Sequence, residues 1–310
     1  MTILLLESLH PEAEALLAAA GTLVHAKDPN APDCDFAGVR AILTRGRGRI
    51  PDALLARCPQ LRVVARAGVG LDNLDTTAAA RRGIPVVFAP GGNALTVAEH
   101  TLALILDLVR GITRAANQVA AGRWEDRAFY RGNEIRGLTL GVLGFGAIGQ
   151  RVAKLADAFG MHVLVLAHGD RAVPAPYAKA ELRELLRTAD VVTLHLPLVP
   201  TTKGLLGADE LAAMKPGACL VNTARGALID GHALRTALAA GTLGGFAADV
   251  LEQEPPAADD PLLRSERVLL TPHNASLTAT TYRAMCLDTA RNVVAILRGQ
   301  APEPRHVLRH

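Results

Sequence analysis

The sequence predicts an α/β protein in which helices cover both faces of doubly wound parallel sheets. Short apolar runs alternate with helical patterns along nearly all of the 310 residues, and this alternation is typical of repeated βα units. Hydrophobic residues make up 50% of the chain and aromatic residues only 3%, so Ala, Val, Leu and Ile must form the core, as in buried parallel strands. At roughly 100 to 200 residues per domain, the length gives room for about two domains.

The first third of the chain is expected to form a small α/β domain. A helix is predicted over residues 12–20, and the apolar runs predicted as strands are residues 3–6, 39–43, 63–65 and 86–88. A long amphipathic helix is then expected over residues 97–121. A helix of this length usually joins two bodies or packs against a partner chain.

The βα alternation becomes more regular from residue 138 onward. The strands predicted there are residues 140–143, 163–166, 191–194, 219–221, 246–248 and 268–270. A complete dinucleotide-binding fold has the same number, six parallel strands with intervening helices. A helix that ends near residue 297 and a short tail follow.

A glycine-rich turn follows the first of these six strands. Gly144, Gly146 and Gly149 form the pattern GxGxxG between that strand and a helix with an apolar stripe. Gly144 permits the tight turn, Gly146 lets a pyrophosphate approach the backbone, and Gly149 lets the helix pack closely on the strand. Because free N–H groups and the helix dipole favour phosphate there, the turn predicts a dinucleotide site.

The next strand lacks the acidic residue that normally binds the adenosine ribose of NAD. That acid is expected about 20 residues beyond the turn, where this sequence has Ala167, followed by His168, Gly169, Asp170 and Arg171. NAD is the expected cofactor, and Asp170 either curls back to the ribose or lies in a solvated loop. Without an acid at Ala167, however, nothing there repels a 2′-phosphate, and His168 or Arg171 can attract one, so NADP stays open.

Composition argues against several other classes of protein. The formal net charge is only +3, with no dense run of Lys and Arg, so no nucleic-acid partner is expected. Four widely spaced cysteines without a CxxC pair indicate neither a metal site nor disulfides. The longest apolar stretch is far shorter than the roughly 20 residues of a membrane span, and the N-terminus lacks the basic start of a signal peptide. We therefore expect a cytoplasmic protein without membrane contact.

Polar residues follow three of the predicted strands in the second half of the chain. Arg225 comes after the fourth of the six strands, Glu254 after the fifth and His273 after the sixth. Because the carboxyl ends of parallel strands meet at one edge of a sheet, these side chains can converge. A proton donor, an acid that orients it and a fixed cation are suited to the reduction of a carbonyl group.

With these motifs in this order, the chain resembles the D-isomer-specific 2-hydroxyacid dehydrogenase family, and within it most the short D-3-phosphoglycerate dehydrogenases. The similarity extends from about residue 3 to residue 297 and includes RAGVGLDNLD (residues 66–75), PGGN (90–93) and VAEH (97–100). The resemblance implies two Rossmann-like or flavodoxin-like domains with a cleft between them. It also implies an NAD(P)-dependent oxidoreductase that acts on CH–OH groups.

By this resemblance His273 is the general acid and base, which exchanges a proton with the substrate oxygen. Glu254 is expected to hydrogen-bond the other ring nitrogen and to raise the imidazole pKa, so that a proton is held near neutral pH. Arg225 is expected to bind the carboxylate and the carbonyl group of a 2-oxo acid, a task that suits a planar, permanently charged fork.

The remaining site residues are also taken from the resemblance. The backbone N–H groups of Gly68, Val69 and Gly70 are expected to bind the substrate carboxylate. Beyond the glycine turn and Ala167, the expected cofactor contacts are Ala147, Ile148, Leu196, Thr223, Ala224 and Asp249.

The resemblance defines the substrate less closely. Arg45 and Arg66, at predicted strand ends of the first domain, either contact a substrate phosphate or are surface charges. The leading substrate pair is 3-phosphoglycerate and 3-phosphohydroxypyruvate. The alternative is a reductase of glyoxylate, hydroxypyruvate or another small 2-oxo acid, and a remote alternative is a corepressor-like protein that senses NAD(H).

The resemblance also implies how the chain is divided and assembled. Residues 1–96 and 278–310 would form the substrate-binding domain, and residues 97–277 the NAD(P)-binding domain. A homodimer is implied, with the helix over residues 97–121 and the cofactor domain at the contact. The expected ligand is a small anionic 2-oxo or 2-hydroxy acid.

Overall fold

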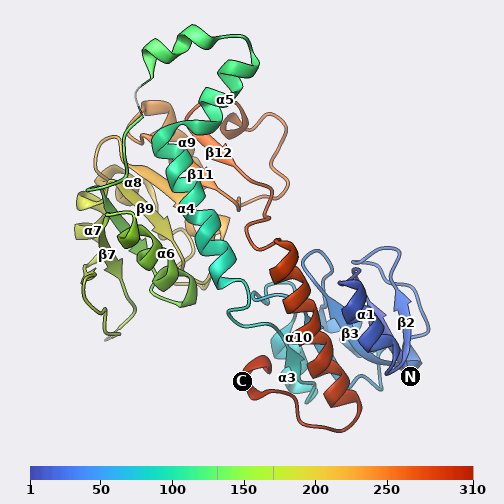
Figure 1. The fold of residues 1–310 in the computed structure, drawn as a ribbon. Coiled ribbons are helices and arrows are strands. Elements are labelled where there is room, and N and C mark those ends of the chain that lie inside the picture. Colours follow the sequence, from blue (N-terminus) through green and yellow to red (C-terminus); the bar gives the residue numbers. More distant parts are fainter. Residues whose placement is uncertain (131, 170, 310) are drawn as a thin grey trace. The chain divides into compact units, whose positions relative to one another are not determined.

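The computed structural model describes residues 1–130, 132–169 and 171–309, and the chain divides into two compact units. Met1–Asn93 and Leu277–His310 form the first unit, and Ala94–Ser276 forms the second. Each unit is a parallel sheet with helices on both faces, which confirms the predicted α/β class (Figure 1). Within the described ranges, no helix is both long and apolar enough to cross a membrane.

The sheet of the first unit has the order β2-β1-β3-β4-β5, with parallel pairing throughout. Its strands are β1 (Thr2–Leu5), β2 (Thr22–His25), β3 (Val39–Thr44), β4 (Val63–Arg66) and β5 (Val86–Val87). Its helices are α1 (Pro11–Ala18), α2 (Asp52–Arg57), α3 (Thr76–Arg81) and α10 (Ala279–Leu297). Strand β2 was not predicted, because this edge strand is only partly buried and has no apolar run.

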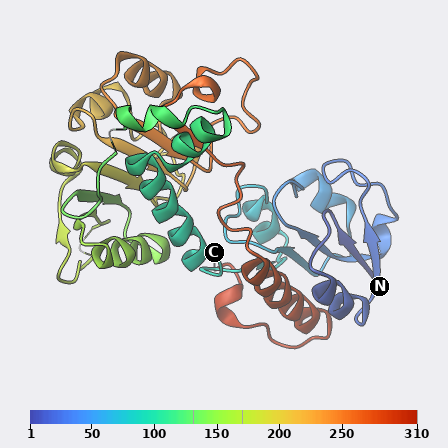
Figure 2. The same cartoon turned by 45° about the horizontal axis from the view of Figure 1, so that its top comes forward.

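Alternate residues of the first strand face opposite layers of this unit. Ile3 and Leu5 belong to the core beneath α1 and α10, whereas Leu4 and Leu6 belong to the core beneath α2 and α3. Figures 1 and 2 show α1 and α10 side by side, although they come from opposite ends of the chain. The end of the chain also joins this unit, since the Leu308 N–H donates to the Val86 carbonyl. The C-terminal segment is therefore a structural layer of the first unit.

The sheet of the second unit has the order β12-β11-β10-β9-β6-β7-β8 and is also parallel. Its strands are β6 (Thr139–Leu143), β7 (His162–Leu166), β8 (Ala178–Lys179), β9 (Val191–Leu194), β10 (Cys219–Asn222), β11 (Gly245–Ala248) and β12 (Val268–Leu270). Its helices are α4 (Ala94–Arg110), α5 (Ile112–Ala120), α6 (Ala147–Ala158), α7 (Leu182–Thr188), α8 (Ala208–Ala213) and α9 (Gly231–Ala240). The strand order reverses between β6 and β9, which is the point where such sheets bind ligands.

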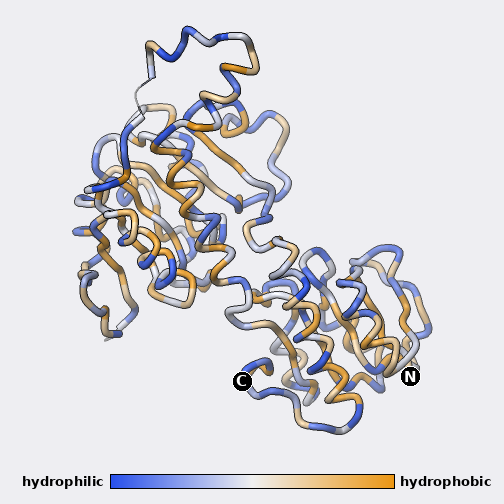
Figure 3. The backbone as a smooth tube through the Cα atoms, in the orientation of Figure 1, coloured by the Kyte–Doolittle hydropathy of each residue, from blue (hydrophilic) through white to orange (hydrophobic). Residues whose placement is uncertain are grey.

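Two layers of helices enclose the second sheet. Side chains of α4 and α6 share one core with one face of the strands, and side chains of α7, α8 and α9 share another core with the opposite face. Figure 3 shows the resulting pattern, in which hydrophobic segments follow the strands and hydrophilic segments follow many of the connecting loops. Because both faces are buried, these strands read as continuous apolar runs in the sequence.

The prediction of a single helix over residues 97–121 is wrong. The chain instead breaks at Gly111, which has a left-handed φ of 61° between α4 and α5. The carboxylate of Asp107, near the end of α4, accepts the Thr113 N–H at 2.7 Å and so binds a free N–H group in the first turn of α5. Glycine tolerates this backbone conformation without steric cost, so the periodic apolar pattern continues while the helix does not. No residue of α5 is buried.

Candidate active site

Three loops at the carboxyl edge of the second sheet carry the predicted catalytic residues. Arg225 follows β10, Glu254 follows β11 and His273 follows β12, and these strands are neighbours in the sheet. The charge of Arg225 acts on both Glu254 and His273. The sheet topology therefore brings together three residues that are up to 48 positions apart in the sequence, from 225 to 273.

His273 and Glu254 form a hydrogen-bonded pair. The Nδ1 atom of His273 lies 2.7 Å from Oε2 of Glu254, and the other carboxylate oxygen accepts the Leu251 N–H at 2.9 Å. The His273 side chain is 51% exposed, and within the described residues its Nε2 atom makes no hydrogen bond. With Nδ1 engaged by a carboxylate, Nε2 is the ring atom that can exchange a proton with a ligand.

The pair shifts the proton affinity of both partners. The hydrogen bond from Glu254 raises the pKa of His273 above its ordinary value, with partial burial and Arg225 opposing the shift. Burial favours the neutral form of Glu254, but hydrogen bonds from His273 and from the Leu251 N–H lower the pKa of this carboxyl below its ordinary value. The site therefore favours an imidazolium next to a carboxylate, which is a proton donor with a fixed orientation.

Asp249 holds the loop that carries His273. Its Oδ1 atom accepts the Thr271 hydroxyl at 2.6 Å and the Asn274 N–H at 2.9 Å, and its Oδ2 atom accepts the Ala275 N–H at 2.9 Å. Between these contacts His273 has a φ of 52°, which is uncommon outside glycine. Asp249 was predicted as a cofactor contact only, and its role as the anchor of this loop was not predicted.

Two further residues of this network were also missed. The Nε2 atom of His100, on α4, lies 3.0 Å from the Thr271 hydroxyl. The His100 imidazole and the Thr271 hydroxyl therefore connect α4 to Asp249. The sequence contains no signal for this contact, because the two residues are 171 positions apart.

Asn222 shapes the loop that carries Arg225. It is fully buried at the end of β10, where its side chain donates to the Arg225 carbonyl at 2.9 Å and accepts the Ala224 N–H at 3.0 Å. The Arg225 guanidinium donates to the Ala224 carbonyl at 2.7 Å. The predicted cofactor contact Thr223 lies in the same loop, with its hydroxyl 2.9 Å from that of Thr101. Asn222 was not predicted as a site residue, although a polar residue at the end of an apolar strand is a signal that could have found it.

The glycine turn has the shape that a dinucleotide phosphate group requires. A Cβ at Gly144, where φ is 101°, would lie 2.6 Å from the His195 carbonyl oxygen, and a Cβ at Gly149 would lie 2.0 Å from the Gly144 oxygen. A Cβ at Gly146, in contrast, would meet nothing within 4 Å. The helix α6 starts directly after it, at the predicted contacts Ala147 and Ile148, without a side-chain cap on its first N–H groups. These groups fit a pyrophosphate.

The structure brings two more predicted cofactor residues to this turn. Leu196 lies beside Gly144, since a Cβ at Gly144 would be 3.0 Å from its Cδ2 atom. Ala167 follows β7, and the Leu166 carbonyl before it accepts the Gly144 N–H. Arg171 also reaches the turn, where it donates to the Phe145 carbonyl at 2.7 Å. Asp170, the predicted substitute for the missing acid, lies outside the described residues.

The predicted substrate residues of the first unit also come together. Arg66 ends β4, and its Nε atom donates to the Arg45 carbonyl at 2.7 Å. A Cβ at Gly68 would lie 3.4 Å from the same Nε atom, so the glycine leaves room for the arginine side chain. The Gly68 N–H donates to the Arg66 carbonyl within the turn. Of the predicted carboxylate donors, Gly68 is therefore engaged locally, and the role of Val69 and Gly70 stays a prediction.

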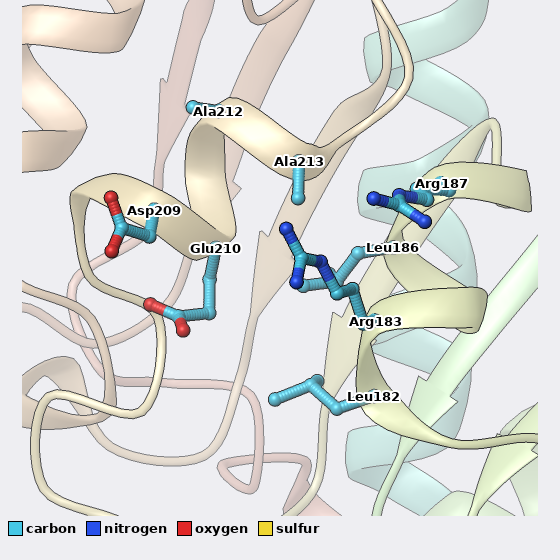
Figure 4. Close-up of a pocket in the computed structure, with 8 residues that line it drawn as sticks. All are labelled: Leu182, Arg183, Leu186, Arg187, Asp209, Glu210, Ala212 and Ala213. Carbon is cyan, nitrogen blue, oxygen red and sulfur yellow. The ribbon is translucent and has the colours of Figure 1, made fainter.

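A separate hollow of about 750 Å³ lies between α7 and α8. Figure 4 shows Arg183 and Arg187 on α7 across from Asp209 and Glu210 on α8. No predicted site residue lines it. Glu210 is used locally, because its carboxylate accepts the Gly207 N–H at the start of α8. This hollow is therefore not part of the candidate active site.

One known family model matches most of the second unit. The family model described as "D-isomer specific 2-hydroxyacid dehydrogenase, NAD binding domain" matches residues 102–275. A solved structure, the TT0316 protein from Thermus thermophilus, has a TM-score of 0.90 and 37% identity over 97% of this chain and 98% of its own. D-lactate dehydrogenase from Aquifex aeolicus, solved with NAD and lactic acid, has a TM-score of 0.86 and 28% identity over 96% of each chain.

Curated relatives with named activities extend over most of the sequence. D-3-phosphoglycerate dehydrogenase from Methanocaldococcus jannaschii is 36% identical over 97% of this chain and 58% of its own length. (S)-sulfolactate dehydrogenase from Chromohalobacter salexigens is 44% identical over 83% of this chain and 84% of its own. Glyoxylate reductase from Aeropyrum pernix is 40% identical over 84% and 81%. The chain spans about half the length of the D-3-phosphoglycerate dehydrogenases that it matches, from 50% to 58%.

Proposed function

The chain belongs to the D-isomer specific 2-hydroxyacid dehydrogenase family, and from this premise we propose that it interconverts a 2-oxo acid and its D-2-hydroxy acid with a nicotinamide dinucleotide. The observation that carries the proposal is the His273–Glu254 pair beside Arg225 at the carboxyl edge of the second sheet. The second unit would bind the cofactor.

Each residue of the site has a distinct task in this reaction. Gly144–Gly149 and the loops after β9 and β10 would hold the dinucleotide, which would supply or accept the hydride when bound. Arg225 binds the carboxylate and polarises the 2-oxo group, as a planar cation with several donors can. Protonated His273 donates a proton from Nε2 to the carbonyl oxygen, and in oxidation it takes that proton back. Glu254 fixes the ring orientation through Nδ1.

We propose that the substrate carries a second anionic group, with 3-phosphoglycerate and 3-phosphohydroxypyruvate as the leading pair. In the first unit the Arg66 side chain donates to the backbone carbonyl of Arg45, and the two residues supply two positive charges. Two relatives have names that specify a phosphorylated or a sulfonated hydroxy acid. Glyoxylate or hydroxypyruvate is the alternative, which the named glyoxylate reductase favours.

NAD is the proposed cofactor, and NADP is the alternative. Ala167 stands where an acid would repel a 2′-phosphate, and the guanidinium of Arg171 lies on the glycine turn. A steady-state screen tests both the cofactor and the substrate. It measures the oxidation of NADH and of NADPH with phosphohydroxypyruvate, sulfopyruvate, hydroxypyruvate, glyoxylate and pyruvate. Turnover fastest with a doubly anionic acid is expected. No turnover with any 2-oxo acid at high enzyme concentration would overturn the enzyme proposal.

Replacing Glu254 with Gln is expected to shift the pH dependence of reduction to lower pH. Reduction needs the protonated form of His273, so its rate falls as the pH rises through the pKa of this residue. Glu254 raises that pKa, and an amide without charge raises it less. The measurement is kcat/KM for reduction as a function of pH.

The matched control for this variant is Glu252→Gln on the same loop. Glu252 pairs with Arg235 at 3.2 Å and does not contact His273 in the described structure. Its pH profile should therefore equal that of the wild type. An unchanged profile in Glu254→Gln would contradict the role assigned to Glu254.

We also propose that the chain is a homodimer that uses α5. Ile112 and Val119 of this helix and Trp124 after it are each more than 50% exposed, and exposed apolar surface of this kind is typical of subunit contacts. A solution mass of twice the 32.6 kDa of one chain is expected. A mass near one chain in analytical ultracentrifugation would refute the dimer.

A further inference from the structure

Glu7 is a buried acid that the active-site chemistry does not use. It follows β1, and its Oε2 atom accepts four successive backbone N–H groups, those of residues 45–48, at 2.8 to 3.0 Å. The Thr44 hydroxyl lies 2.9 Å from the same oxygen. Successive N–H groups that converge on one point form an anion-binding nest. In this protein the anion in the nest is a side chain of the chain itself.

Burying this carboxylate costs free energy unless hydrogen bonds compensate for the lost hydration. Glu7 is only 7% exposed, and burial by itself favours its neutral form. The hydrogen bonds from the loop and from Thr44 nevertheless lower the pKa of Glu7 to about 2, so the group is ionised at neutral pH. Its Oε1 atom has no hydrogen-bond partner among the described residues. The nearest cation is the exposed Arg47, with Nε at 3.6 Å.

The loop that Glu7 holds carries one of the predicted substrate residues. The Arg45 guanidinium lies over the ring of Tyr282, a residue of α10, at 5.1 Å from the ring centre. The Arg45 carbonyl accepts the Nε–H of Arg66 at 2.7 Å. The conformation of one loop therefore fixes the side chain of Arg45 and one contact of Arg66. Because the carboxylate fills the nest, a ligand anion has the arginine side chains to bind and not the N–H groups of this loop.

We propose that Glu7 is a positioning residue for an anion site of the first unit: by ordering residues 44–48 it holds Arg45 and a contact of Arg66, and these two side chains bind a phosphate or sulfonate group. The inference rests on the proposed function for the identity of the substrate but not for the anion site itself. Glu7 touches neither substrate nor cofactor in this scheme. Its removal should therefore weaken binding of a doubly anionic substrate and spare a singly anionic one.

The test compares substrates in Glu7→Ala and Glu7→Gln. In Glu7→Ala, KM for phosphohydroxypyruvate should rise about tenfold, the effect of one charge-assisted hydrogen bond. The KM values for glyoxylate and for the cofactor should stay within about twofold. Glu7→Gln keeps one acceptor oxygen and should show a smaller rise. If the alanine variant does not fold, the glutamine variant alone carries the comparison.

The matched control is Asp260→Asn in the second unit. Asp260 is also buried and also bound by several donors, from Arg235 and the Leu262 N–H. This variant should lose comparable stability and keep the wild-type ratio of the two KM values. An equal change of KM for phosphohydroxypyruvate and glyoxylate in Glu7→Ala, or no change in either, would overturn the proposal.

A second measurement separates this proposal from the proposed enzyme function. With the dinucleotide site saturated by NADH, inorganic phosphate should raise the Tm of the wild type and of Asp260→Asn, and this rise should be lost in Glu7→Ala. If the wild type turns over no 2-oxo acid but this pattern is observed, the enzyme proposal fails and the role of Glu7 stands. A phosphate-dependent rise of the same size in all three proteins, or none in the wild type, would overturn the role of Glu7.

Discussion

Replacing His273 with Ala is expected to lower kcat for reduction of a 2-oxo acid by roughly 10²- to 10⁴-fold, the usual contribution of a general acid. The physical reason is that Glu254 cannot replace His273 as the proton donor, because the Glu254 carboxylate is ionised and accepts a hydrogen bond from the ring. The affinity for NADH should stay unchanged, because His273 lies beyond β12 and the glycine turn follows β6. Steady-state kinetics and a fluorescence titration with NADH check the two parts.

Two further variants make this result specific. His273→Asn keeps a residue that tolerates the φ of 52° at this position, so it removes the acid without backbone strain and should lose as much kcat as His273→Ala. His162→Ala, an exposed histidine on β7, should keep wild-type kcat. If His273→Asn retains activity, or if both His273 variants lose NADH affinity, His273 is a structural residue.

Replacing Arg225 with Lys is expected to lower kcat/KM for the 2-oxo acid by roughly 10²- to 10³-fold, the range seen when one donor to a developing oxyanion is lost. Lysine keeps the positive charge but not the planar fork that can bind a carboxylate and a carbonyl oxygen together. It also cannot reproduce the contact that the guanidinium makes with the Ala224 carbonyl. The loss should appear in both kcat and the KM of the acid, whereas the KM of the cofactor should be unchanged.

Arg187→Lys, an exposed residue on α7, is the matched control for Arg225→Lys and should have wild-type kinetics. A variant Arg225→Lys with an unchanged KM for the acid would refute direct contact with the substrate. In that case Arg225 would act only through its charge on Glu254 and His273.

In the second unit, the strand-end residues could be predicted from the sequence, but the contacts that support them could not. The glycine turn and the residues after β10, β11 and β12 follow from strand-end logic, because in a parallel sheet the order of strands places their carboxyl ends together. Asp249, Thr271 and His100 form one network only because α4 passes the same edge of the sheet. No local pattern in the sequence contains that information. The break at Gly111 was missed for a related reason, since apolar periodicity continues through it.

The sequence by itself determined the fold class and predicted the glycine turn and the candidate residues Arg225, Glu254 and His273, because apolar periodicity, glycine spacing and strand ends are local properties. Only the tertiary structure decided which further groups hold the loops of the site: Asp249 on the loop after β12, Asn222 on the loop of Arg225 and, in the first unit, Glu7 on the loop of Arg45. The bonds of Asp249 and Glu7 join residues from 22 to 41 positions apart. Such partners are selected by packing, which brings distant strand ends together in space.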